Sequence, residues 1–298
     1  MAHKNITIFA NIFVNNQRRF QHLKDSFNSF KDISDNWLIN VRGDLREDVI
    51  DFLKQSLGNK MVLFELLDDN RPGGGWFRNA LDMVGEAKHD YILVWNEDHV
   101  NLAPQEVYPE IIKEMKENNV DYMMYSWWVF GEYRKNFLAD NLEEHEYIDT
   151  VYLTKKLWKH QLDKGYDKYI ISMSGIFNKK FLIKLLKQER YKLPRWITTN
   201  LFRVMILLDR LGFKFNHRKY YDLINRLIFG KLTKWQNNYP FELEKSPYRW
   251  DILPIKMGLA KYELFACIDD NLGYPGSDLI SRGLYKEDKK YDKRDTTH

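Results

Sequence analysis

Four polar residues, Asn96, Glu97, Asp98 and His99, directly follow the hydrophobic run Tyr91–Trp95. A short apolar run of this kind is typical of a buried β-strand. Alternate residues of an extended chain point to the same side, so Asn96 and Asp98 are expected to project together from its end. Mg²⁺ and Mn²⁺ prefer oxygen ligands, often carboxylates combined with substrate phosphates. The pattern predicts a Mn²⁺ or Mg²⁺ site here, and an ordinary polar loop is the alternative.

The elements that must position these residues alternate between strand and helix patterns through the first hundred residues. This alternation predicts βαβ units, and therefore an α/β fold with a mostly parallel central sheet and helices on both faces. Ligands of such sheets collect at the carboxyl ends of the strands. Strands are expected at 6–13, 37–41, 60–66 and 91–95, and helices at 18–30, from 44 to 57, and at 77–87.

The second half of the chain is less regular. We expect one domain at 1–215 and a C-terminal elaboration at 216–298, with lid or acceptor-side loops and a charged, disordered tail from Lys286. The expected elements are a helix opening at Pro104, strands at 121–130, 169–177 and 262–268, helices at 178–187, 197–211 and 223–232, and a charged loop with helical pieces at 131–168.

Composition excludes several classes of protein. The 298 residues carry 46 Lys and Arg against 42 Asp and Glu, and 44% are hydrophobic, which is typical of a globular chain with a sizeable core. The single cysteine, Cys267, argues against a disulfide framework and a cysteine-based zinc site. No apolar run approaches the length of a membrane span, and no signal peptide is evident. We therefore expect a cytoplasmic protein.

Positive charge is concentrated in one segment. Residues 179–234 contain 15 Lys and Arg against three acidic residues, a net of +12. Such a segment favours an anionic partner, such as a phosphate group, an acidic membrane surface or nucleic acid. A solvated basic face is the alternative.

The N-terminal half resembles the GT-A glycosyltransferases, in particular the family 2-like enzymes. The stretch Gly75–Leu81 (GWFRNAL) is similar to their glycine followed by an Arg-Asn helix start, and Tyr91–Asp98 is similar to the strand that delivers their Asp-x-Asp motif. The resemblance covers roughly residues 5–100 and weakens toward about 215, where 174–177 and 211–214 look like acceptor-side landmarks. It implies a GT-A-like (Rossmann-like) fold and a nucleotide-sugar donor.

The resemblance also implies donor-binding roles. Phe13 and Asn15 would line the nucleobase pocket, and Asp44 would contact base or ribose. Asp44 can instead be read as a helix cap, in a capping-box variant with Glu47. Arg78 would face the diphosphate from a helix N-terminus, and Asn79 belongs to the same helix start.

The metal and catalytic residues complete the expected site. Asp98 would hold the metal with help from Asn96, with Glu97 as an alternative ligand on the donor side and His99 as a third ligand. Asn96 departs from the family, since it replaces the first acid of Asp-x-Asp. A second departure is that 196–201 lacks the usual acidic general base. The candidate replacements are Asp149, Asp269 and Asp270.

These features predict a metal-assisted glycosyltransferase. It would move a sugar from a nucleotide-diphosphate donor to a glycan or lipid-linked acceptor, in surface polysaccharide synthesis, with 179–234 at the inner face of a membrane. A nucleotidyltransferase is the first alternative, although 15–19 lacks the glycine such enzymes carry after the first strand. A basic nucleic-acid-binding protein is the second, although a regular aromatic platform is missing.

Overall fold

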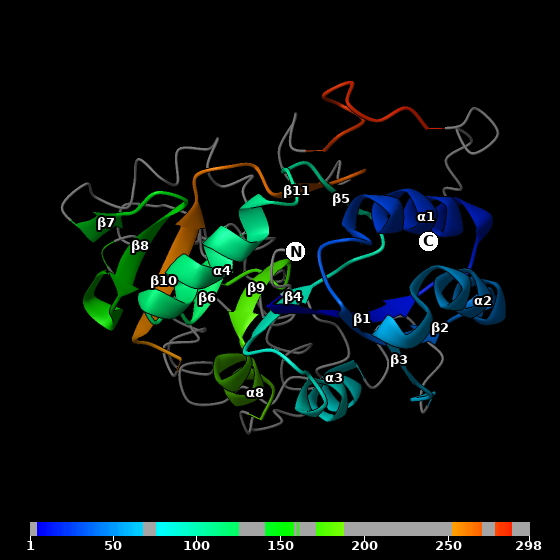
Figure 1. Cartoon of the computed structure of the whole chain (residues 1–298), viewed down its shortest axis with the longest axis horizontal. Coiled ribbons are helices and arrows are strands. Elements are labelled where there is room, and N and C mark those ends of the chain that lie inside the picture. The colour runs from blue at the N-terminus through cyan, green and yellow to red at the C-terminus, as the bar shows by residue number, and fades with distance from the viewer. Residues whose placement is uncertain are drawn as a thin grey trace, which may run out of the picture.

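A computed structural model describes residues 5–67, 76–124, 141–157, 160, 171–187, 252–269 and 278–287. Among these residues the chain forms an α/β fold around a nine-stranded sheet, with a separate two-stranded sheet (Figure 1). The strand order of the large sheet is β3-β2-β1-β4-β9-β6-β10-β8-β7. In the described part of the chain, none of the helices is both long and apolar enough to span a membrane.

The elements fall close to the predicted ranges in the first half of the chain. The large sheet contains β1 (Ile6–Phe13), β2 (Asn36–Arg42), β3 (Met61–Phe64), β4 (Tyr91–Val94), β6 (Tyr122–Met124), β7 (Leu142–Glu144), β8 (Ile148–Leu153), β9 (Gly175–Asn178) and β10 (Ile255–Ala260). The small sheet pairs β5 (His99–Asn101) with β11 (Phe265–Cys267). The helices are α1 (Gln17–Phe30), α2 (Arg46–Leu57), the short η1 (Gly58–Lys60), α3 (Trp76–Gly85), α4 (Val107–Glu117) and α8 (Lys179–Lys187).

The large sheet is mostly parallel, as the alternation of elements predicts. Strands β3, β2, β1 and β4 pair in parallel, and so do β6 and β10. Strand β9 is antiparallel to β4 and β6, and β8 is antiparallel to β10 and β7. Only β9 and β8 therefore run against the common direction, and the carboxyl ends of β1, β2, β3 and β4 share one edge of the sheet.

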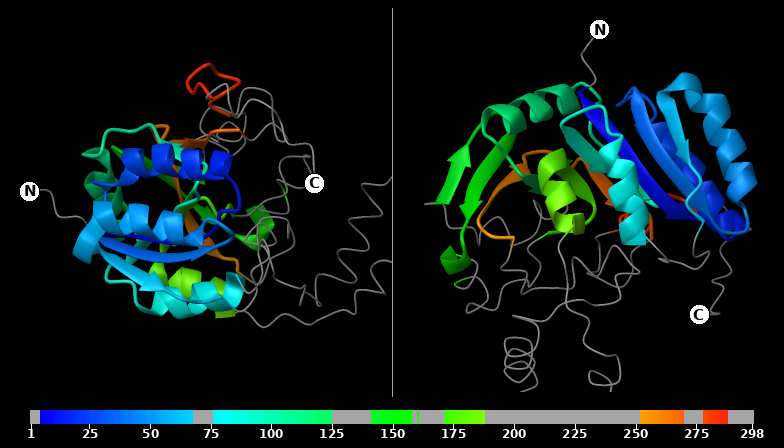
Figure 2. Two further views of the ribbon diagram at one scale, coloured as in Figure 1. Left: turned by 90° about the vertical axis from the view of Figure 1, so that its right-hand side faces the viewer. Right: turned by 90° about the horizontal axis from the view of Figure 1, so that it is seen from below.

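Helices cover both faces of the sheet (Figures 1 and 2). The hydrophobic side chains of α1, α2 and α4 form one core with one face of the sheet, and those of α3 and α8 form a second core with the other. The strands of the large sheet other than β7 contribute residues to both cores, because successive side chains point to opposite faces. In β4, for example, Leu93 belongs to the first core, and Ile92 and Val94 belong to the second. Burial on both faces explains why the sequence of β4 is an unbroken run of hydrophobic residues.

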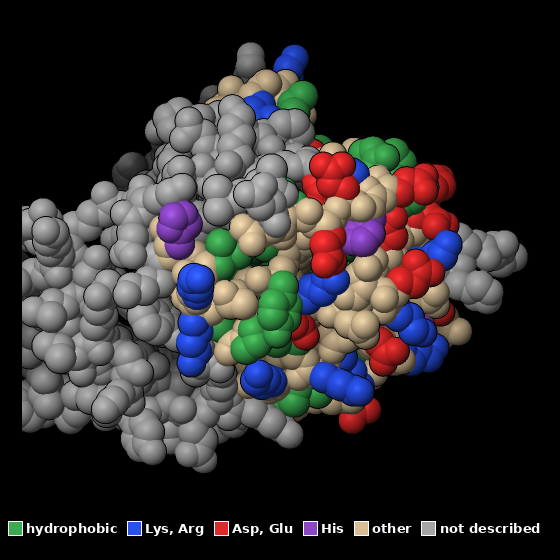
Figure 3. All heavy atoms as spheres, turned by 90° about the vertical axis from the view of Figure 1, so that its left-hand side faces the viewer, with side chains coloured by type: hydrophobic (Ala, Val, Ile, Leu, Met, Phe, Trp, Pro, Cys, Tyr) green, Lys and Arg blue, Asp and Glu red, His purple; other side chains and the backbone are tan. Residues whose placement is uncertain are grey.

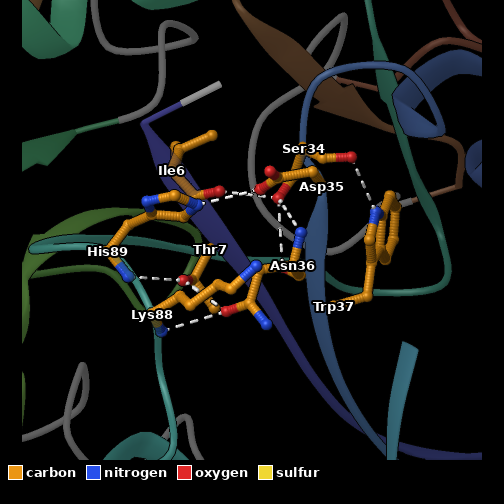
Figure 4. Close-up of polar contacts among 8 residues, drawn as sticks. All are labelled: Ile6, Thr7, Ser34, Asp35, Asn36, Trp37, Lys88 and His89. Carbon is orange, nitrogen blue, oxygen red and sulfur yellow. Dashed lines mark hydrogen bonds and ion pairs between the residues drawn. The ribbon is translucent and has the colours of Figure 1, made fainter. Parts of the chain in front are cut away.

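A polar seam joins the amino ends of β1, β2 and β4 (Figure 4). Asn36 is buried, and its Oδ1 accepts hydrogen bonds from Thr7 Oγ1 at 2.8 Å and from the backbone N–H of Lys88 at 3.1 Å. The Ser34 hydroxyl donates to the Ile6 carbonyl at 2.6 Å, and the N–H of His89 donates to Thr7 Oγ1 at 3.2 Å. These contacts fix three strands at the end opposite to the predicted site.

The β7 end of the large sheet carries charge. Glu143 and Glu144 lie on this edge strand, and Lys256 pairs with Glu143 across β8 at 2.7 Å. Figure 3, which views this side, shows acidic and basic side chains lying beside one another. Charged side chains on an edge strand disfavour pairing with another chain.

Several second-half expectations need correction. Strands β7 and β8 lie in the range 131–168 that was expected to be a loop with helical pieces, and strands β5 and β10 were not expected. Strand β10 enters the large sheet between β6 and β8, so this part of the segment 216–298 is built into the sheet. The expected boundary at 215 and the helices at 197–211 and 223–232 lie outside the described residues.

We expected a disordered tail from Lys286 onward, but Lys286 and Glu287 belong to the described residues and Glu287 makes specific contacts. Glu287 contacts Arg18 and lies 3.1 Å from the Nε2 atom of His22, and the Tyr285 hydroxyl donates to Asp25 at 2.6 Å. The three partners follow one another along one face of α1 at helical spacing. The segment 278–287 therefore packs on α1, on the side of the sheet shown at the top of Figure 1.

The polar seam makes a prediction about stability. Asn36→Ala leaves the buried Thr7 Oγ1 and the partly buried Lys88 N–H without their acceptor. We expect the free energy of unfolding to fall by about 1–3 kcal/mol, measured by urea denaturation. Asn59→Ala, at an exposed position of η1, is the matched control and should change it by less than about 0.5 kcal/mol. Equal losses in both variants would contradict the role assigned to Asn36.

Candidate functional site

The chain leaves the large sheet directly after β4. The N–H of Trp95 still bonds to the Phe9 carbonyl at 2.9 Å, and a turn over 96–98 then leads into β5. Strand β5 packs against α1, where the Ser26 hydroxyl donates to the His99 carbonyl and accepts from Trp95 Nε1 at 2.7 Å. Because both sides of the turn are anchored to Ser26, the polar residues 96–99 are held beside α1.

A buried ion pair lies at the centre of this turn. The Glu97 side chain is 8% exposed and contacts the Arg19 guanidinium, whose side chain is 41% exposed. Burial raises the pKa of Glu97 even though the charge of Arg19 lowers it, and the neighbouring Asp98 adds to the rise. The carboxylate of Glu97 in turn raises the pKa of Arg19. The pair links the first turn of α1 to the β4–β5 turn.

Asp98 and His99 form a second side-chain contact in the same turn. Asp98 Oδ1 lies 2.7 Å from His99 Nδ1, and the Asp98 side chain is 31% exposed. Burial alone would raise the pKa of Asp98, but His99 and Arg19 lower it to about 2. Asp98 is therefore a carboxylate at neutral pH, which a role as a metal ligand requires.

Ser174 connects the remaining members of the turn. Its hydroxyl accepts a hydrogen bond from Asn96 Nδ2 at 2.7 Å and lies 3.3 Å from His99 Nε2. Ser174 precedes β9, the antiparallel neighbour of β4. Three of the predicted site residues, Asn96, Asp98 and His99, thus belong to one connected network.

The structure adds Cys267 to this network. One ligand atom each from Asp98, His99 and Cys267 lies within 4.8 Å of the others. Cys267 comes from β11, where it stands directly opposite His99 in the antiparallel pairing of β5 and β11. The single cysteine of the chain argues against a zinc site built from several cysteines. One cysteine can still take part in a site whose other ligands are a carboxylate and an imidazole.

The donor set can be compared with the Mn²⁺ or Mg²⁺ that the sequence predicts. The Asp98 carboxylate suits those ions, whereas imidazole and thiolate suit zinc and its neighbours better than magnesium. Asp98 and His99 therefore fit a divalent cation, and the thiol of Cys267 does not fit Mg²⁺.

The candidate general bases lie in different places. Asp269 follows β11 and forms an ion pair with Arg18 at 2.7 Å, and its side chain is 25% exposed. Its charge also acts on Arg19, so it stands near the Glu97 pair. Asp149 is buried on β8, which lies beyond β9, β6 and β10 from β4, and it pairs with Lys261 at 3.4 Å. The structure brings Asp269 to the turn but not Asp149, and Asp270 lies outside the described residues.

The predicted donor-side residues follow β1 and β2 at the same sheet edge. Phe13 is partly buried at the end of β1, and Asn15 is exposed. Gly43 has a φ of +101°, and a Cβ there would stand 2.3 Å from the Val14 carbonyl oxygen, so only glycine allows the two loops to approach this closely. Asp44 is exposed beside this contact.

The expected capping role of Asp44 is wrong. Helix α2 begins at Arg46, and its N-cap is Leu45, which makes no side-chain cap hydrogen bond. The close approach of Gly43 to Val14 shifts the helix start by fixing the path of the loop, and the Leu45 N–H bonds to the Val14 carbonyl at 3.1 Å. Asp44 therefore keeps the donor-side interpretation as a prediction.

Three buried asparagines hold the residues on either side of the segment 68–75, which contains Gly73, Gly74 and Gly75. Asn40 exchanges hydrogen bonds with the backbone of Leu66, at 3.1 and 3.2 Å, and also donates to Asn11 Oδ1 at 3.0 Å. Asn79 donates to the Leu66 carbonyl at 3.1 Å, and its buried Oδ1 has no hydrogen-bond partner in the described structure.

The same network reaches the first turn of α3. Asn11 donates to the Trp76 carbonyl at 3.3 Å, and Trp76 Nε1 donates to the Asn11 carbonyl at 3.0 Å. The residues before and after 68–75 are thereby fixed to β1 and β2. Arg78 lies in the first turn of α3, and its side chain is outside the described part of the chain.

Three residues of this site, Arg19, Asn11 and Cys267, were not among the predicted site residues, and Ser174 was noted only as part of the acceptor-side landmark 174–177. Asn11 was detectable, because it is a polar residue inside the otherwise hydrophobic run of β1. Arg19 carries no such signal, since it meets the turn only through the packing of α1.

Known proteins show limited similarity to this chain. No family model and no curated protein matches its sequence. Among solved structures, S. aureus TarS 1–349 is 14% identical with a TM-score of 0.37, over 61% of this chain and 48% of that chain. TarS 1–349 in complex with UDP-GlcNAc is 13% identical with a TM-score of 0.39, over 61% and 46%. The chain therefore spans less than half the length of these solved chains.

The Glu97–Arg19 pair yields a testable prediction. Arg19→Gln leaves a buried carboxylate without its counter-charge, so we expect a loss of roughly 2–3 kcal/mol in the free energy of unfolding. The double variant Arg19→Gln/Glu97→Gln should recover part of this loss. Arg46→Gln is the control, because the carboxylates that it leaves, Glu47 and Glu65, are more than 70% exposed. Denaturant unfolding of the wild type and the three variants checks the prediction. A double variant that is no more stable than Arg19→Gln, or an equal loss in Arg46→Gln, would contradict it.

Proposed function

We propose that this protein is a glycosyltransferase that uses a nucleotide-diphosphate sugar as donor and a carbohydrate hydroxyl as acceptor. The observation that carries the proposal is the charged cluster at the end of β4, where Asp98, His99, Glu97 and Arg19 meet beside the N-terminus of α1. The order of elements in the first hundred residues, which resembles the family 2-like GT-A enzymes, supports the same interpretation. The site stands at the sheet edge where ligands of α/β proteins collect.

The donor would extend along the carboxyl ends of β1, β2 and β4. In this proposal Phe13, Asn15 and Asp44 contact the base and ribose from the loops that meet at Gly43. The diphosphate then lies between the β4–β5 turn and α3, with Arg78 and Asn79 on the α3 side. The first turn of α3 adds the partial positive charge of a helix N-terminus.

The leaving diphosphate gains negative charge as the sugar bond breaks, and fixed positive groups stabilise that charge. Arg19 is held by Glu97 at this position, and 41% of its side chain remains exposed for an anionic ligand. A divalent cation held by Asp98, with His99 and Asn96 beside it, would supply Lewis-acid stabilisation of the leaving group when bound.

The acceptor hydroxyl needs a base to take its proton. Among the candidates we favour Asp269, because it pairs with Arg18, the residue before Arg19, and its charge acts on Arg19. Asp270, the next residue, is the second candidate, and Asp149 stands four strands from β4 in the sheet.

The acceptor side and the cellular setting extend the proposal. A polyanionic or lipid-linked glycan would suit the net charge of +12 over 179–234. We propose surface polysaccharide synthesis at the cytoplasmic face of a membrane, with this segment in peripheral contact with the acidic surface.

Calorimetric titration with UDP, GDP, dTDP and CMP, each with and without Mn²⁺, tests the donor site. We expect one of these nucleotides to bind in the micromolar range with Mn²⁺, and Asp98→Asn to weaken that binding at least tenfold because it removes the anionic ligand. Asp35→Asn, at the opposite end of the sheet, is the matched control and should bind as the wild type does. Absence of binding for every nucleotide under both conditions would refute the donor site.

A further inference from the structure

Three side chains of different chemistry meet at the β4–β5 turn. One carboxylate oxygen of Asp98, one ring nitrogen of His99 and the Sγ atom of Cys267 lie within 4.8 Å of one another. We propose that these three side chains form a binding site for a divalent ion of the zinc class, with Cys267 as a metal ligand. The thiol is the element of the site that neither the acidic sequence motif nor the expected Mn²⁺ or Mg²⁺ ion explains.

The backbone holds the three residues in fixed positions. His99 and Cys267 are directly paired across β5 and β11, and the Ile268 N–H donates to the Asp98 carbonyl at 2.7 Å. The ligand atoms of one tetrahedral zinc ion lie roughly 3.3–3.6 Å apart, given bond lengths of about 2.0–2.3 Å. The longest separation in the cluster therefore has to shorten by about an ångström, and the 2.7 Å contact between Asp98 Oδ1 and His99 Nδ1 has to open by about half an ångström. Side-chain rotation can supply both changes without moving the ladder.

Neighbouring groups orient the imidazole from one side. The Ser174 hydroxyl lies 3.3 Å from Nε2 of His99, and Asn96 in turn donates to Ser174 at 2.7 Å. A polar partner on one ring nitrogen fixes the ring plane of a metal-binding histidine and tunes its basicity. Asp98 Oδ1 lies 2.7 Å from Nδ1, so an ion bound by both atoms would replace that contact.

The donor set decides which ion is bound. Thiolate and imidazole favour Zn²⁺ and Co²⁺, whereas Mg²⁺ takes oxygen ligands almost exclusively. Three protein ligands also leave the fourth position of a tetrahedral ion open, as in catalytic zinc sites. If the proposed function is right, an oxygen of the donor diphosphate takes that position, but binding of the ion itself does not depend on it.

Titration with Co²⁺, a spectroscopic substitute for Zn²⁺, tests the site in the full-length protein under a non-thiol reductant. Ligation of Co²⁺ by a thiolate gives an intense charge-transfer band in the near ultraviolet. Because Cys267 is the one cysteine of the chain, this band shows directly that Cys267 binds the ion. We expect one Co²⁺ per chain with this band, displacement by one equivalent of Zn²⁺, and no displacement by millimolar Mg²⁺. Cys267→Ser should lose the band and bind Co²⁺ at least tenfold more weakly.

His99→Gln tests the imidazole, and His89→Gln is its matched control because His89 lies in the polar seam at the opposite end of the sheet (Figure 4). His99→Gln should weaken binding at least tenfold and His89→Gln should not. Circular dichroism shows whether each variant is folded. If His99→Gln is not folded, the Cys267→Ser variant remains as the test of the site.

Wild-type Co²⁺ binding without the band, unchanged affinity in Cys267→Ser, or equal competition by Mg²⁺ would each overturn the proposal. If the protein gives the band but binds none of the tested nucleotides, the result supports the metal site and refutes the proposed function. If it binds a nucleotide diphosphate but shows no thiolate band, the result supports the proposed function and refutes Cys267 as a ligand.

Discussion

The contact between Arg19 and Glu97 is the constraint on which the site depends. A carboxylate that is 8% exposed is costly unless a counter-charge and hydrogen bonds compensate it, and Arg19 provides both from the first turn of α1. The contact also sets the position of the following residues, because Asp98 and His99 belong to the same tight turn. The charged turn can therefore leave the sheet next to α1 and still remain largely buried.

A second constraint acts on the donor side of the proposed site. Asn11, Asn40 and Asn79 are buried side chains that lie between the ends of β1, β2 and β3 and the first turn of α3. Their hydrogen bonds to Leu66 and Trp76 fix the residues before and after 68–75 at the sheet edge. Buried polar networks of this kind favour one geometry strongly, since each lost partner leaves an unpaired polar group.

The sequence predicted those elements whose hydrophobic pattern is long enough to show a period. β1, α1 and β4 lie within a residue or so of their expected ranges, and α4 starts three residues after Pro104, where its helix was expected to open. Strands β5 and β7 were not predicted, because three residues are too few to show a period. Strand β5 forms because β11, which lies in the strand expected at 262–268 and is distant in the sequence, accepts its hydrogen bonds, whereas β7 pairs with the adjacent β8. The capping prediction at Asp44 failed for a related reason, since the contact of Gly43 with Val14 comes from a different strand end.

The position of strand β10 has a consequence for the order in which the molecule can be assembled. It fills the gap between β6 and β8 and pairs with both, although more than a hundred residues separate it from either in the chain. A nascent polypeptide can therefore complete β1 to β4 early in synthesis, but β8 and β7 cannot join the large sheet until residue 260 has been made. Pairings of such long sequence separation close slowly, because loop entropy is lost before contacts compensate it. The far half of the sheet should thus be the last part to form, and chains that end prematurely would leave its strands unsatisfied.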